Sequence, residues 1–307
     1  MKVPLTAFSG VVLVSRGDET LVSEARGFAH RGYGVENTAD TRFAIASGTK
    51  GFTALVVVGL IAEGRLSLET TARSILGADL PLIDDAVTVE HLLTHTSGIG
   101  DYCDEEADPP PTPLLATSAD YLGALDGFPQ RSVPGTEFRY SNGAFAVLGL
   151  LAERVAGRPF PDLVHERVCA PAGMTDTAFL RSDALPGRTA TGYLEDGRTN
   201  VFSLPVAGFG DGGIYSTAPD IRKFWPAFLG GRIVAREWVT RMLRPHTDRY
   251  GLGFWLPWPG AVRLEGGDHG VSFRSTHANG VTATLISNHH RGGGPLLRQL
   301  DEFLTKP

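Results

Sequence analysis

The sequence has little cysteine, little lysine and no long apolar run. Its 307 residues include two cysteines, Cys103 and Cys169, which are too few for a disulfide framework. The longest apolar run, residues 54–62, is interrupted by Gly59 and is too short to cross a bilayer, so no membrane segment is expected. The net charge of −6 offers no basic surface, and nucleic-acid binding is therefore not expected.

The N-terminal residues lack the charged and then apolar pattern of a secretory leader. We therefore expect a cytoplasmic protein, or a mature secreted form from which a leader has been removed. With 42% hydrophobic and 20% charged residues, the composition is that of a globular protein with one large or two modest domains.

One of the four lysines follows a serine by three positions. Residues 47–63 predict an apolar helix, which places Ser47 at its start and Lys50 one turn further on the same face. A hydroxyl beside an amine is a candidate activated nucleophile. Chance alone gives about 0.2 such Ser-x-x-Lys pairs. The pattern by itself therefore remains equally compatible with a serine that caps a core helix.

Strands are predicted near both ends of the chain, and helices dominate the middle. The predicted strands are residues 9–15, 20–28, 41–46, 250–256, 262–264, 271–277 and 281–287. We therefore predict an α+β fold, with an antiparallel sheet built from both chain ends and helices packed on it.

Two structural parts follow from this arrangement. Residues 1–75 and 206–307 are predicted to form an α/β domain with the antiparallel sheet, and residues 76–205 a mostly helical domain. The cleft between the two is the expected site. An acidic, proline-rich segment at residues 104–113 is expected to be an exposed loop, and its length and acidity would also suit a loop that flanks the entrance of a site.

A second motif lies just before the predicted helix at residues 145–155. Tyr140 and Asn142 form the one Tyr-x-Asn pattern of the chain. An asparagine-capped helix with a core tyrosine would produce the same pattern. The joint presence of Ser-x-x-Lys and Tyr-x-Asn favours the functional interpretation over the structural one.

With these motifs the chain resembles the serine β-lactamase-related hydrolases. That family includes class C β-lactamases, D-alanyl-D-alanine carboxypeptidases, D-aminopeptidases and related esterases with the penicillin-binding-protein fold. The resemblance covers nearly the whole chain, and three stretches carry it most specifically: residues 91–99 (HLLTHTSGI), 138–142 (FRYSN) and 212–220 (GGIYSTAPD). It implies a β-lactamase/transpeptidase-like fold and an acyl-enzyme mechanism without a cofactor or a metal.

The resemblance also implies roles for individual residues. Ser47 would attack a carbonyl, and Lys50 and Tyr140 would share the proton transfers, with either as the base. Asn142 would hold a polar group of the substrate or Lys50 itself. The helix that begins at Ser47 would offer one backbone N–H to an oxyanion, and an edge strand would offer the second.

The third motif of the family, Lys-Thr-Gly or His-x-Gly, is absent from its usual place. Glu265-Gly266-Gly267 best fills the position, so that Asp268 or a neighbour would supply the second N–H. A glutamate there would repel a substrate carboxylate by about 1 kcal/mol or more. His269 or Arg274 could restore a cation.

We therefore expect a serine hydrolase that acts on small neutral or amine-bearing esters, amides or short peptides. No cofactor, metal, nucleic acid or membrane partner is expected, and the oligomeric state is left open. The alternatives are a β-lactamase, a D-alanyl-D-alanine peptidase, a D-aminopeptidase, an acyltransferase, and a non-catalytic ligand-binding or sensor domain. His91 and His95 are predicted to be structural, with His95 bonding the turn at Ser97 and Gly98.

Overall fold

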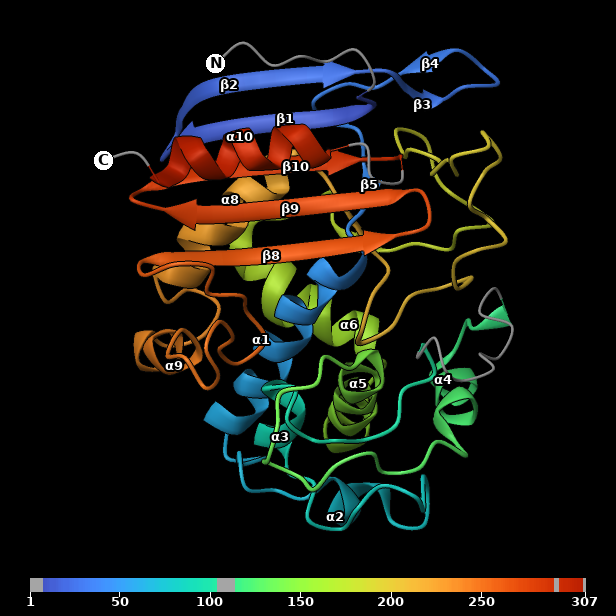
Figure 1. Ribbon diagram of the computed structural model, residues 1–307, viewed down its shortest axis with the longest axis vertical. Coiled ribbons are helices and arrows are strands. Elements are labelled where there is room, and N and C mark those ends of the chain that lie inside the picture. Colours follow the sequence, from blue (N-terminus) through green and yellow to red (C-terminus); the bar gives the residue numbers. More distant parts are fainter. Residues whose placement is uncertain (1–7, 104–113, 290–292, 306–307) are drawn as a thin grey trace.

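A five-stranded antiparallel sheet forms one layer of the computed structural model, which describes residues 8–103, 114–289 and 293–305 (Figure 1). The predicted acidic loop lies outside these residues. The strand order is β2-β1-β10-β9-β8. The strands are β1 (Gly10–Arg16), β2 (Glu19–Arg26), β8 (Ala261–Asp268), β9 (Val271–Ala278) and β10 (Val281–Ser287). Two of them come from the start of the chain and three from its end, which confirms the predicted sheet.

The two faces of the sheet are covered by different helices, because successive strand residues point to opposite sides. Val12 and Val14 of β1 pack in a core with leucines of the C-terminal helix α10 (Gly294–Thr305). Val11 and Leu13 belong to the larger core, which contains α1 (Thr49–Ala62) and α8 (Ala218–Leu229). Figure 1 shows α10 on one side of the sheet and α8 on the other.

The remaining elements are short helices and strands that build the rest of the molecule. The helices are α2 (Ala72–Leu76), α3 (Val89–Leu93), α4 (Ser118–Leu125), α5 (Asn142–Ala156), α6 (Phe160–Val164), α7 (Ala170–Ala172) and α9 (Arg236–Met242), with a π-helical turn at His165–Cys169. The strands are β3 (Phe28–His30), β4 (Val35–Glu36), β5 (Phe43–Ala44), β6 (Ala178–Phe179) and β7 (Ile214–Ser216).

Helix α1 joins the sheet to the helical part, because it packs against α5 within the same core. The division into domains at residues 75/76 and 205/206 therefore stays a prediction. None of the helices in the described part of the chain combines the length and the apolar character that crossing a membrane requires.

Two predicted elements differ from the observed ones. The helix predicted from Ser47 begins at Thr49, and Ser47 lies in a short 3₁₀ helix, η1 (Ala46–Gly48). The segment predicted as a strand at residues 250–256 makes isolated bridges instead. Gly253 turns the chain there with φ of 82°, in close contact with Ala54, and this turn breaks the strand.

Candidate active site

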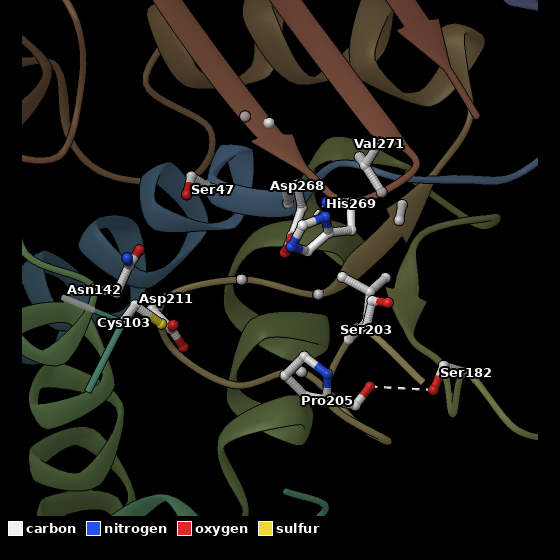
Figure 2. A pocket seen from close by; sticks show the side chains of 18 of the residues that line it. Ser47, Cys103, Asn142, Ser182, Ser203, Pro205, Asp211, Asp268, His269 and Val271 are labelled. Carbon is white, nitrogen blue, oxygen red and sulfur yellow. Dashed lines mark hydrogen bonds between the residues drawn. The ribbon is translucent and has the colours of Figure 1, made fainter. Parts of the chain in front are cut away.

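A cavity of about 830 Å³ lies where the end of β8 meets η1 and the helical part of the molecule (Figure 2). Seven of the eight residues predicted for the site line it: Ser47, Tyr140, Asn142, Glu265, Gly267, Asp268 and His269. The eighth, Lys50, is buried and bonds directly to Ser47. The fold thus gathers residues that lie more than two hundred positions apart in the sequence.

Ser47 reaches the cavity through a strained turn. The preceding residue, Ala46, has φ of 44°, a conformation that costs a non-glycine residue energy and is often found at functional sites. Two glycines then let the nucleophile helix approach the sheet. A Cβ on Gly48 would lie 2.4 Å from Phe273, and one on Gly51 would lie 2.3 Å from Leu264.

Lys50 is 2% exposed and bonds three acceptors around the nucleophile. Its Nζ donates to Ser47 Oγ at 3.0 Å, to Asn142 Oδ1 at 2.7 Å and to the carbonyl oxygen of Asp211 at 2.6 Å. An ammonium group has three hydrogens to donate, so these contacts use all of them. The arrangement is that of a charged lysine fixed beside a serine hydroxyl.

The backbone on both sides of Asp211 is bonded to side chains of helix α1. Thr53 Oγ1 donates to the carbonyl of Gly210 at 2.5 Å, and the Ile214 N–H donates to Thr49 Oγ1 at 3.1 Å. These bonds tie the start of the glycine-rich motif at residues 212–220 to the turn of α1 that carries Lys50. The segment just before the motif thereby supplies the third acceptor for Lys50, the carbonyl oxygen of Asp211.

Asp211 is a site residue that the sequence analysis missed. Its Oδ2 accepts a hydrogen bond from the Tyr102 hydroxyl at 2.5 Å, and Figure 2 shows it beside Cys103 and Asn142. Burial raises the pKa of its carboxyl group, while the charge of Lys50 opposes the shift. The one available signal was the position of Asp211 directly before the glycine pair of the motif.

Tyr140 and Asn142 are placed by the start of helix α5. Asn142 is the first residue of this helix, and its N–H donates to Asp101 Oδ2 at 2.5 Å. The Ser141 hydroxyl, rather than Asn142, caps the helix. The Tyr140 ring lies between His95 and Trp255, and Lys50 Nζ lies 5.1 Å from its centroid.

The hydrogen-bond partner that was predicted for His95 was wrong. The ring does not bond the turn at Ser97 and Gly98. Its Nδ1 instead accepts the N–H of Ser141, and its Nε2 contacts the Tyr250 hydroxyl. The residue lies in a sharp turn with φ of 57°, which aims the ring at the Tyr-x-Asn motif. His91 caps helix α3 together with Thr88.

The edge strand β8 presents Gly267 to the cavity. The N–H and the carbonyl of Arg263 both bond Trp255, which lies on the side of β8 away from β9. Backbone direction alternates along an antiparallel strand, so the peptide groups of Gly267 also point away from β9, whereas those of Asp268 point toward it. Of these two predicted candidates, the N–H of Gly267 is thus the one that points away from β9.

Gly266 lies against Ser47, the predicted nucleophile. A Cβ at this position would lie 2.7 Å from the Ser47 nitrogen and 2.3 Å from the Ile45 carbonyl oxygen. Gly267, in contrast, faces open space. The backbone N–H groups of Ser47 and Gly267 thus belong to two segments in close contact, as an oxyanion site requires.

Glu265 lines the cavity, and its charge is paired with two arginines, one of which is the Arg274 named in the sequence analysis. Its carboxylate accepts from Arg274 Nε at 3.0 Å and lies 3.6 Å from Arg263 Nη1. Both arginines also bond Asp301 of α10, at 2.5 Å from Arg263 and 3.1 Å from Arg274. Strand alternation turns Glu265 toward α10 and turns the buried Leu264 toward α1. Arg274 is part of the same ion-pair cluster with Glu265 and Asp301.

The cavity as a whole has an acidic lining. Asp211 and Asp268 border it, and its described lining includes no lysine or arginine. Burial raises the pKa of the Asp268 carboxyl group, whose Oδ1 accepts the His269 N–H at 2.7 Å. Cys103, which follows the stretch at residues 91–99 by four positions, is exposed and lines the same cavity. Within the described residues, no cluster of His, Cys, Asp and Glu could hold a metal ion.

Comparison with known proteins places this geometry in a family. The family model described as Beta-lactamase matches residues 4–301. The chain belongs to the β-lactamase family. The crystal structure of a penicillin-binding protein from Bacillus halodurans is 34% identical, with a TM-score of 0.89 over 96% of this chain and 97% of that one.

Two curated relatives in the β-lactamase family indicate the range of its chemistry. Esterase EstB of Burkholderia gladioli is 34% identical over 60% of this chain and 49% of its own length. A D-aminopeptidase of Brucella anthropi is 32% identical over 86% of this chain and 52% of its own length. The chain therefore spans about half the length of these relatives, and the resemblance to serine β-lactamase-related hydrolases is confirmed at the level of the family.

Proposed function

We propose that this chain is a serine hydrolase that cleaves small esters or amides through an acyl-Ser47 intermediate. The observation that carries the proposal is the 3.0 Å contact between Lys50 Nζ and Ser47 Oγ at the edge of a cavity of about 830 Å³. The esterase and the D-aminopeptidase among its relatives support esters and amides as the substrate classes.

In the proposed reaction, Ser47 Oγ bonds the substrate carbonyl carbon while its proton passes to Tyr140. Tyr140 is favoured over Lys50 as the base, because the three Lys50 donors are already occupied. Lys50 Nζ lies 5.1 Å from the centroid of the Tyr140 ring, so the two groups are close enough to share the proton transfers.

The oxyanion of the tetrahedral intermediate would accept hydrogen bonds from the N–H groups of Ser47 and Gly267. The leaving group takes the proton from Tyr140 as its bond to the carbonyl carbon breaks. A water molecule then attacks the acyl-Ser47 ester and gives a proton to Tyr140, which returns it to Ser47 Oγ as the acid product leaves.

The acidic lining of the cavity supports neutral or amine-bearing substrates. A substrate carboxylate would meet Asp211 and Asp268, and no lysine or arginine in the described lining would compensate it. An ammonium group on the substrate would be attracted. β-Lactams and peptides that end in D-alanine carry a carboxylate, so we expect them to be poorer substrates.

A substrate panel tests this proposal. We expect p-nitrophenyl esters or D-aminoacyl amides to have a kcat/KM at least about 10-fold above that of a chromogenic β-lactam, and Ser47→Ala to lower kcat at least about 1,000-fold. The control is Ser203→Ala, which removes another hydroxyl from the same cavity and should retain activity. Full activity in Ser47→Ala would overturn the mechanism, and preferred turnover of the β-lactam would overturn the substrate class.

A further inference from the structure

His95 is buried beside the proposed base and has no part in the proposed reaction. It lies just after α3, and its ring is 0% exposed. Helices α3 and α5 pack against each other, which brings the end of α3 close to the segment that leads into α5. A polar ring enclosed this completely needs partners for its nitrogens, and those partners define its role.

The hydrogen bonds of His95 hold the backbone on both sides of Tyr140. Its Nδ1 accepts the N–H of Ser141 at 3.1 Å, and its carbonyl oxygen accepts the N–H of Arg139 at 2.7 Å. One residue thus holds the peptide group that follows the tyrosine and the peptide group that precedes Arg139. Few rotations remain by which the Tyr140 backbone could shift relative to Ser47.

The partners of the ring also define its tautomer. A backbone N–H can only donate, so Nδ1 must carry the lone pair, and in the neutral ring Nε2 must carry the hydrogen. Nε2 lies 3.2 Å from the Tyr250 hydroxyl, which accepts that hydrogen. Both nitrogens are therefore satisfied by the neutral ring and by this tautomer.

The same ring packs directly on the proposed base. The centroids of His95 and Tyr140 are 4.4 Å apart with an interplanar angle of 33°, and Trp255 stacks on Tyr140 at 6.1 Å. Phe145 and Phe138 enclose the histidine at 4.9 and 5.7 Å. The phenol ring is thus fixed by contacts on its face as well as through its backbone.

We propose that His95, as a neutral imidazole, is the positioning residue that holds Tyr140 in line for proton transfer with Ser47. This inference rests on the proposed role of Tyr140 in the reaction. A protonated ring would place an N–H at Nδ1 against the N–H of Ser141, so the bond that fixes the segment would be lost. The neutral state of His95 is thereby a condition for an ordered base.

The groups that face His95 favour this neutral state. They are Lys50 from α1, Tyr140 from the segment before α5, and Tyr250 from the segment before β8. Burial, and then the positive charge of Lys50, hold the pKa of His95 well below its ordinary value of 6.5. The ring therefore stays neutral at the pH at which Tyr140 would act.

Two substitutions of His95 separate the positioning bond from the rest of the side chain. In His95→Asn the amide oxygen takes the place of Nδ1, and asparagine tolerates the φ of 57°. In His95→Gln the amide reaches the place of Nε2, and the acceptor for Ser141 is lost. Tyr250→Phe removes only the hydroxyl partner of Nε2 and serves as the matched control.

We expect kcat to fall in the variant that loses the hydrogen bond to the Ser141 N–H and to be retained in the variants that keep it. We expect His95→Asn and Tyr250→Phe to keep kcat within about 5-fold of the wild type, and His95→Gln to lower it about 50-fold or more with KM within about 3-fold. Equal kcat in the two His95 variants, or a change confined to KM, would overturn the inference. If His95→Gln does not fold, a 50-fold loss in a folded His95→Asn would overturn it as well.

Tyr140→Phe distinguishes this inference from the proposed function. Full kcat in Tyr140→Phe would contradict the assignment of the base itself. A large loss in Tyr140→Phe together with full kcat in His95→Gln would leave the hydrolase mechanism intact and contradict only the role of His95.

Discussion

At the level of single residues, the contact between strand β8 and Ser47 depends on the absence of a side chain at position 266. The space that a Cβ would need there is occupied by the Ile45 carbonyl and the Ser47 nitrogen, which are backbone atoms and cannot rotate away. The neighbouring Gly267 has no atom within 4 Å of its own Cβ position. A side chain is therefore excluded at Gly266, whereas the adjacent Gly267 has room for one.

This difference predicts opposite outcomes for two alanine substitutions. Gly266→Ala should push β8 away from η1, lower kcat/KM about 100-fold or more and destabilise the fold by about 1–3 kcal/mol. Gly267→Ala keeps its N–H and should change kcat/KM by less than about 10-fold. Steady-state kinetics and thermal melting of the two variants check this, and a harmless Gly266→Ala would contradict the proposed contact.

At the level of elements, the two faces of strand β8 separate two carboxylates that are close in sequence. Glu265 lies in the ion-pair cluster with Arg274 and Asp301 on the α10 side. Asp268 lies at the end of the strand, where it lines the cavity. The first is expected to influence stability and the second substrate choice.

We therefore predict that Glu265→Gln changes the stability of the fold, whereas Asp268→Asn changes the substrate preference. Glu265→Gln should lower the free energy of unfolding by about 1 kcal/mol, without changing the preference between amine-bearing and carboxylate-bearing substrates. Asp268→Asn should lower kcat/KM about 3- to 10-fold for amine-bearing esters relative to neutral ones. The ratio of the two kcat/KM values measures this, and a shift in the ratio with Glu265→Gln would contradict the placement of the two groups.

The same strand shows how far the sequence alone could lead. Short runs rich in apolar and β-branched residues were sufficient to predict β1, β9 and β10, and in β1 the successive apolar residues fill the two cores in turn. Alternation could not show which way the peptide groups of β8 point, since this depends on the distant contact between Arg263 and Trp255. The sequence alone therefore left it open whether Asp268 or a neighbouring residue would supply the second N–H.

Site residues were predictable where a local pattern fixes their spacing. Ser47 and Lys50 share a helical turn, and Tyr140 and Asn142 flank a helix start, so both pairs are visible in the sequence. Asp211 was missed because its role arises from tertiary contacts with Lys50 and Tyr102. No spacing in the sequence encodes these contacts.

At the level of the whole molecule, buried histidines make stability depend on pH. Burial lowers the pKa of His95, His246 and His277 below 6.5. As pH falls below 6.5, the unfolded chain binds protons that the folded chain does not, so the free energy of unfolding falls as well. Burial raises the pKa of Asp211 and Asp268, and this acts in the opposite direction at lower pH.

His277 offers the cleanest test of this dependence, because it is not among the residues that line the cavity and it bonds Thr282 of β10. His277→Asn removes its contribution and leaves those of the carboxyl groups in place. The loss of unfolding free energy between pH 6.5 and pH 5.5 should be smaller in the variant than in the wild type, by up to about 1 kcal/mol. Denaturant titrations at the two pH values measure this, and equal losses would contradict a buried neutral His277.

The central claim is that Ser47 forms a covalent acyl intermediate, and intact-protein mass spectrometry tests it most directly. After incubation with a fluorophosphonate probe, we predict a single adduct that peptide mapping assigns to Ser47. The adduct should persist in Ser203→Ala and be absent from Ser47→Ala. A folded wild-type protein whose mass does not change, or an adduct that maps to another residue, would contradict the account.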